Sequence, residues 1–127
     1  MLTLMREGGF STWVVMLLGL ITLATAGAFS IRADRRSLGF IEWMNRATLY
    51  ATLVGLVANI GAVGHHVSGM MLGSWKLPPG NEGLTPASAL LMGIGESMAP
   101  ALIGFALLSM SALLTAIGHR RMDAKET

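Results

Sequence analysis

The sequence predicts an all-α integral membrane protein with three transmembrane helices in a single domain, residues 1–127. The chain is 53% hydrophobic and 13% charged, whereas soluble domains carry charge on about a quarter of their residues. Its apolar residues also gather in three runs, each near or above the roughly 20 residues that a helix needs to cross a bilayer. We expect spans at about 11–31, 47–67 and 87–117.

The first predicted span, 11–31, contains no charged residue, and three arginines follow it within five positions. An uncharged run that is followed directly by basic residues favours a retained transmembrane helix. A cleavable signal peptide stays open as the alternative, because Arg6 precedes the run and the small residues at 24–26 resemble a cleavage site. The run exceeds the roughly 7–15 residues of a signal peptide's apolar region, which favours retention.

Small residues recur at four-residue spacing in the second and third spans. In the second span Ala51, Gly55 and Asn59 form one such row, and in the third Gly93, Ser97 and Ala101 form another. Small residues at this spacing let helix backbones approach closely in lipid. We expect helix-packing positions at Ala51, Gly55, Gly61, Gly93, Ala101 and Gly104. Three helices alone offer too little partner surface for all of them, so the pattern predicts a homo-oligomer or a partner helix.

The third span holds a carboxylate, Glu96, as the only ionisable residue between 87 and 117. Charged groups at the bilayer centre cost at least about 2.5–3.5 kcal/mol and usually face a protein interior or an aqueous path. Pro100 lies four residues later, and because it has no N–H, we expect a kink there. Thr85 and Pro86 are typical of a helix N-cap followed by a first-turn proline.

Seven of the nine basic residues lie on one predicted side of the membrane, in the first loop and the C-terminal tail. They are Arg32, Arg35, Arg36, Arg46, Arg120, Arg121 and Lys125. Because cytoplasmic loops carry an excess of lysine and arginine, this predicts an outside N-terminus and a cytoplasmic C-terminus. The same distribution explains the net charge of +2 by membrane orientation, so we do not expect nucleic acid as a partner.

Catalytic and metal chemistry have little support in the sequence. The chain has no cysteine, and it contains no hydrolytic triad or phosphate-binding loop, so we expect no enzyme activity and no cofactor. His65 and His66 are weak metal candidates, because adjacent residues on a helix point about 100° apart and do not converge on one ion. The sequence thus predicts no metal site.

In the third span, the sequence GIGESMAPALIGF at 93–105 resembles the third helix of the MotA/TolQ/ExbB proton-channel family. Gly93, Ile94, Glu96, Met98 and Gly104 stand where that family's pattern has its residues, with near substitutes at Ser97 and Phe105. The second span is similar to the family's second helix through Leu53, Gly55, Leu56 and Gly61, and Gly8-Gly9 also looks like the family.

The resemblance implies a multi-pass protein of the bacterial inner (cytoplasmic) membrane. It also implies a homo-oligomer, pentameric in the family, around the single transmembrane helix of a partner that brings an aspartate. Where the family has threonines along its ion path, this chain has Asn59 and Ala101, and the family's large cytoplasmic region is missing.

Two functions remain open at this point. In the first, the chain is a subunit of a proton-conducting, stator-like complex, with Glu96, Asn59 and Ser97 as ion-path candidates. In the second, it is a non-conducting structural or assembly subunit of another membrane complex, and Glu96 is a structural residue that hydrogen-bonds a neighbouring subunit or a free carbonyl near Pro100.

Overall fold

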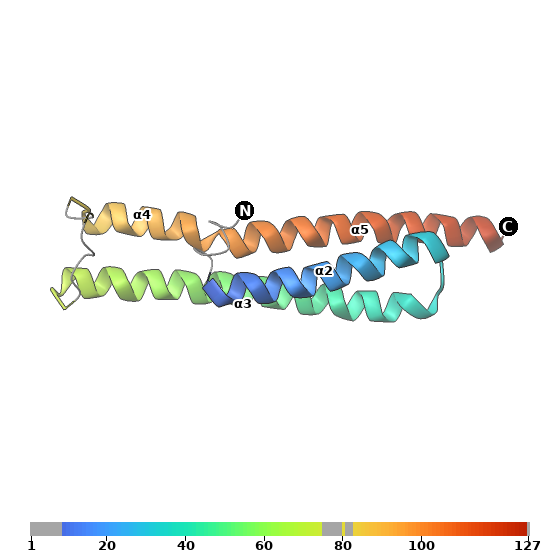
Figure 1. Ribbon diagram of the computed structural model, residues 1–127, viewed down its shortest axis with the longest axis horizontal. Helices are drawn as coiled ribbons and strands as arrows, with labels where there is room; N and C mark the ends of the chain where they lie inside the picture. Colours follow the sequence, from blue (N-terminus) through green and yellow to red (C-terminus); the bar gives the residue numbers. More distant parts are fainter. Residues whose placement is uncertain (1–8, 75–79, 81–82, 127) are drawn as a thin grey trace.

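The computed structural model describes residues 9–74, 80 and 83–126, and for Gly9 and Glu126 the backbone only. All regular structure in these residues is α-helical. In chain order the helices are α2 (Gly9–Arg32), α3 (Arg36–Met71), α4 (Pro86–Ser97) and α5 (Ala99–Glu126). They form an elongated bundle in which α4 and α5 run end to end beside α3 (Figure 1).

Three helical stretches are long and apolar enough to cross a membrane: Phe10–Arg32, Arg36–Met71 and Pro86–Lys125. The prediction of an all-helical chain with three such helices is therefore confirmed, and the architecture is consistent with a multi-pass membrane protein. The helices extend beyond the predicted spans, most clearly α3, which begins at Arg36 rather than near residue 47. Charged residues such as Glu42 and Arg46 are good helix formers, so they lengthen a helix without lengthening its apolar run.

The interior of the bundle is mixed, with buried polar side chains beside buried apolar ones such as Val15, Phe29 and Ile41, while its surface is largely apolar. Its buried polar side chains are Thr12, Thr22, Ser30, Thr48, Thr52, Ser97 and Ser111. By contrast, large apolar side chains are widely exposed, including Phe10, Val54, Leu91 and Leu102. Exposed apolar patches of this extent indicate contact with lipid or with other protein chains.

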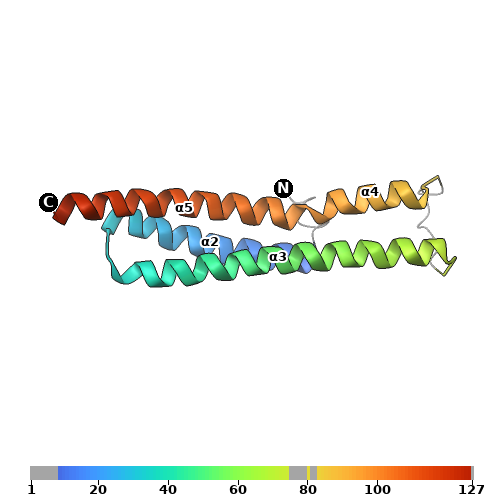
Figure 2. The same ribbon diagram turned by 180° about the vertical axis from the view of Figure 1, so that it is seen from behind.

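The bundle is not equally thick along its length. Helix α2 packs between α3 and α5 but stops well short of the end where the chain passes from α3 to α4 (Figures 1 and 2). The region formed by α2, α5 and residues 36–58 of α3 is here called the three-helix part. The region formed by α4 and residues 59–71 of α3 is called the two-helix part.

Close contacts between α2 and α5 hold the three-helix part together. A Cβ atom on Gly19 would overlap Leu107, and one on Gly118 would overlap Phe29, so only glycine permits these approaches. Near the C-terminus, the Arg121 guanidinium donates a hydrogen bond of 3.0 Å to the Ser30 carbonyl. Parallel packing of the first and last helices thus encloses the interior.

Local sequence explains two helix boundaries. Thr85 has extended backbone angles and its hydroxyl accepts a 3.2 Å hydrogen bond from the Ser88 N–H, with Pro86 beginning α4. The predicted cap is therefore confirmed. Between α2 and α3 the chain turns at Ala33, whose φ of 50° lies in the left-handed region, where residues with a Cβ are disfavoured.

Candidate functional site

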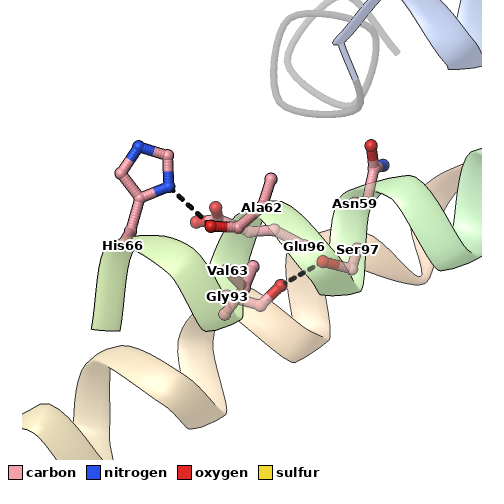
Figure 3. Close-up of a pocket in the computed structure, with 7 residues that line it drawn as sticks. All are labelled: Asn59, Ala62, Val63, His66, Gly93, Glu96 and Ser97. Atoms are coloured by element: carbon pink, nitrogen blue, oxygen red, sulfur yellow. Dashed lines mark hydrogen bonds between the residues drawn. The ribbon is translucent and has the colours of Figure 1, made fainter. Parts of the chain in front are cut away.

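A cleft opens between α3 and α4 in the two-helix part, and it contains the predicted carboxylate (Figure 3). It has a volume of about 200 Å³. Four lining residues come from α3 and three from α4: Asn59, Ala62, Val63 and His66, then Gly93, Glu96 and Ser97. This α3–α4 cleft brings all three ion-path candidates, Glu96, Asn59 and Ser97, to one place.

Helix periodicity explains why these residues meet. On α3 the lining residues recur at intervals of three, four and seven positions from Asn59, which places them on one helix face. On α4 Gly93, Glu96 and Ser97 have the corresponding spacing. A Cβ atom on Gly93 would lie 2.6 Å from the Val63 side chain, so glycine at this position lets the two helices approach and brings Glu96 to α3.

Glu96 is exposed at the end of α4, next to an interruption of the helix. Helix α4 ends at Ser97, Met98 forms a turn, and α5 begins at Ala99. The Met98 N–H donates to the Gly95 carbonyl, and the Leu102 N–H donates to the Met98 carbonyl at 2.9 Å. The interruption thus lies two residues before Pro100, which cannot donate a backbone hydrogen bond.

Asn59 and Ser97 supply neutral polar groups to the cleft. Ser97 is only 3% exposed, and its hydroxyl donates a 2.7 Å hydrogen bond to the Gly93 carbonyl. The Asn59 amide oxygen accepts a longer hydrogen bond, 3.4 Å, from the Ser11 hydroxyl of α2. Asn59 therefore connects the cleft to the start of the three-helix part.

The structure separates the two adjacent histidines. Their ring centroids are 6.3 Å apart with planes at 70°, and only His66 lines the cleft with Glu96. Its Nδ1 lies 2.8 Å from the Ala62 carbonyl oxygen, so Nδ1 carries the proton in the neutral ring and Nε2 is the basic nitrogen. In the part of the chain that the structure describes, no three His, Asp or Glu side chains group as metal ligands.

The predicted packing positions divide between the two parts of the bundle. Gly55 lies against Ser11 and Pro100, and a Cβ on Gly104 would overlap Thr52. Ala101 is buried and Ala51 is partly buried. Gly61, by contrast, is exposed and has nothing within 4 Å of a Cβ position. Within one chain, Gly61 therefore makes no close helix contact.

Sequence reasoning missed the polar interior of the three-helix part. The Thr22 and Thr48 hydroxyl oxygens lie 3.0 Å apart, and Thr52 donates to the Thr48 carbonyl. Further along, Ser111 donates to the Asn45 amide oxygen at 2.9 Å. The four-residue spacing of Thr48 and Thr52 places both on one face of α3. This spacing could have predicted that their hydroxyls lie together inside the bundle.

A second cleft, of about 360 Å³, opens between α3 and α5 near the arginine-rich end of the bundle. Its lining residues are Leu38, Ile41, Glu42, Asn45, Thr115 and His119. This α3–α5 cleft was not predicted from the sequence.

The α3–α4 cleft thus brings together a carboxylate, an imidazole, an amide and a hydroxyl, from Glu96, His66, Asn59 and Ser97. Among the lining residues that the structure describes, Ser97 supplies the hydroxyl, and this hydroxyl donates to the Gly93 carbonyl. Comparisons with family models, with curated proteins and with solved structures gave no match.

Proposed function

We propose that the chain is a subunit of an oligomeric, proton-conducting complex of the bacterial inner membrane. One observation supports this above the others. Glu96, the only ionisable residue in its apolar run, lies in a cleft with His66, Asn59 and Ser97 in the two-helix part. An exposed carboxylate on an apolar helix surface is costly in lipid, so it belongs beside water or another polar chain.

The surface that α2 leaves uncovered supports the proposed oligomerisation. The buried residues of α3 are Ile41, Thr48, Thr52 and Gly55, all in the three-helix part. In the two-helix part, Met71 and Leu91 are 73% and 72% exposed. Copies of the chain that pack through the two-helix part would cover this surface and place several Glu96 carboxylates around one axis.

The resemblance to the MotA/TolQ/ExbB family supplies the remaining parts of the proposal. It suggests a pentameric ring around a single-span partner whose aspartate exchanges protons with the ring. The basic residues at one end of the bundle favour an outside N-terminus and a cytoplasmic C-terminus. Single cysteines replacing Ser37 and Ser74 in intact cells test this orientation, because an impermeant thiol reagent should label only the second.

A structural or assembly subunit is the second candidate, and one observation favours it. The hydroxyls inside the three-helix part are hydrogen-bonded to backbone carbonyls or to each other, as with Thr22, Thr48 and Thr52. Hydroxyls engaged in this way hold helices together, which is the role that a structural subunit needs. If the copies of the chain form no proton path between them, the complex is purely structural.

The experiment is proton flux into liposomes that contain the co-purified complex with its partner. Glu96→Gln preserves size and most hydrogen bonding, but an amide does not exchange protons near neutral pH. We expect flux to fall by at least about 100-fold, as when a proton-transfer group is lost. Asp34→Asn, an exposed acid in the turn between α2 and α3, is the control and should keep wild-type flux.

Two outcomes would contradict this proposal. Undiminished flux in the Glu96→Gln complex would remove Glu96 from the mechanism. Absence of flux in the intact wild-type complex would instead favour the structural subunit, and Glu96→Leu should then loosen assembly while Glu96→Gln does not.

A further inference from the structure

The α3–α5 cleft combines an apolar floor with a polar rim. Leu38 and Ile41 line it, and both belong to the cluster around the buried Phe29 and Met122. The same lining includes Asn45, Thr115 and His119, which supply an amide, a hydroxyl and an imidazole. The Asn45 oxygen is already engaged by Ser111, which orients the amide and leaves its two N–H donors for another acceptor.

Several side chains place this cleft at the depth of lipid headgroups. Trp43 is exposed on α3 beside the cleft, and tryptophan is enriched at membrane–water interfaces. On α5 the continuous apolar run ends at Ile117, which is exposed, and His119 and Arg120 follow. The cleft therefore lies where hydrocarbon gives way to phosphate.

Glu42, which lines the cleft, is paired with Arg46, a neighbour on α3 that is not itself a lining residue. Glu42 Oε1 and Arg46 Nη2 are 2.5 Å apart, and the two side chains are 64% and 52% exposed. The Arg46 guanidinium also lies over the Trp43 ring, 5.2 Å from its centroid. These two contacts hold Arg46 in place while leaving most of its five N–H donors for another acceptor.

An exposed ion pair of this kind contributes only about 0–1 kcal/mol, so both members can share their charges with a ligand. The best match is a ligand that carries a phosphate and a primary ammonium a few bonds apart. A purely anionic headgroup would be repelled by the Glu42 carboxylate. A quaternary ammonium has no N–H to donate to this carboxylate.

We propose that the α3–α5 cleft binds the headgroup of a phosphatidylethanolamine-type lipid, with Arg46 and Asn45 on its phosphate and Glu42 on its ammonium. The acyl chains then continue along the exposed apolar surface of α3 and α5. This site depends on the membrane placement of the bundle but not on proton conduction, so either proposal stands if the other fails.

The test is lipid retention by the purified complex in mild detergent, measured by native mass spectrometry with three added lipids of equal acyl chains. These are phosphatidylethanolamine, phosphatidylcholine and phosphatidylglycerol. We expect phosphatidylethanolamine to be retained about five- to tenfold better than phosphatidylcholine, since they differ in the N–H donors that Glu42 accepts. Equal retention of the two, or preference for phosphatidylglycerol, would overturn the proposal.

Two variants locate the preference. Glu42→Gln should abolish the discrimination between ethanolamine and choline headgroups, while Arg46→Gln should weaken retention of both. Asp34→Asn removes an acid from the same end of the bundle outside the cleft and should change neither. If Asp34→Asn and Glu42→Gln have equal effects, the preference arises from diffuse surface charge and the site is refuted. Should a variant fail to fold, the wild-type comparison of headgroups still decides.

Discussion

The three-helix part and the two-helix part of the bundle use the same residue types but bury them differently. In the three-helix part, Gly55 and Gly104 lie in contacts too close for a larger residue, and threonine hydroxyls fill the interior. In the two-helix part, Gly61 and Gly64 have nothing within 4 Å of a Cβ position. Gly93 is different, since a Cβ there would lie 2.6 Å from the Val63 side chain. Small residues therefore permit close helix contacts in both parts, while at Gly61 and Gly64 they leave surface that is open within one chain.

The largest effect is expected when a large side chain is placed at a glycine of the three-helix part. Gly104→Leu would force α5 away from Thr52, whose side chain occupies the space a Cβ would take. We expect a loss of about 3 kcal/mol or more in the free energy of unfolding, since overpacking of this kind separates whole helices. Thermal unfolding in detergent, followed by circular dichroism, measures it.

Gly61→Leu is the matched control for that variant. Because the space around Gly61 is open within one chain, its thermal midpoint should match the wild type. If copies pack through the two-helix part, the mass of the complex should nevertheless fall. Equal destabilisation by both substitutions would contradict the distinction between the two parts.

A smaller effect is expected from the threonine pair. Thr48→Val keeps the shape of the side chain but removes its hydrogen bond to Thr22 across the helix interface. Interhelical hydrogen bonds in membranes contribute about 0.6 kcal/mol on average. We therefore expect the free energy of unfolding to fall by about this amount. The double variant with Thr22→Val should cost less than the sum of the two single variants, whereas Ser109→Ala on the exposed face of α5 should be silent.

The smallest effect concerns the turn between α2 and α3. Ala33 has a left-handed φ of 50°, which costs about 1–2 kcal/mol in residues with a Cβ. Glycine removes this backbone strain, but it also raises the conformational entropy of the unfolded chain, which lowers the free energy of unfolding by about 0.4–1 kcal/mol. Ala33→Gly should thus stabilise the protein by about 0.5 kcal/mol, and a lower melting temperature would contradict this.

Sequence alone predicted the features that depend on local chemistry. Apolar length predicted the three long helices, and the Thr85-Pro86 pair predicted the start of α4. Four-residue spacing marked Gly55 and Gly104, which lie in tight contacts, whereas Gly61, marked by the family resemblance of the second span, lies in none. Spacing shows which residues share a helix face, while the helix that covers this face depends on tertiary packing.

The candidate site shows the same division. Glu96 was predicted because a lone carboxylate in an apolar run is conspicuous in any sequence. His66 was separable from His65 only once α4 was placed against α3, since both histidines are equally polar and adjacent. The α3–α5 cleft was missed because its lining residues come from helices that are some 70 positions apart in the sequence.

The packing of α2 against α5 also has a consequence for biogenesis. Ribosomes extend a chain by about 5–20 residues per second, so several seconds pass between completion of Arg32 and synthesis of Ala99, where α5 begins. During this interval the face of α2 that carries Gly19 and Phe29 has no α5 to cover it. The insertion machinery or the surrounding lipid must cover this face of α2 until α5 has been synthesised. Termination of synthesis before α5 would leave a two-span fragment with that face uncovered, which is a ready target for membrane proteases.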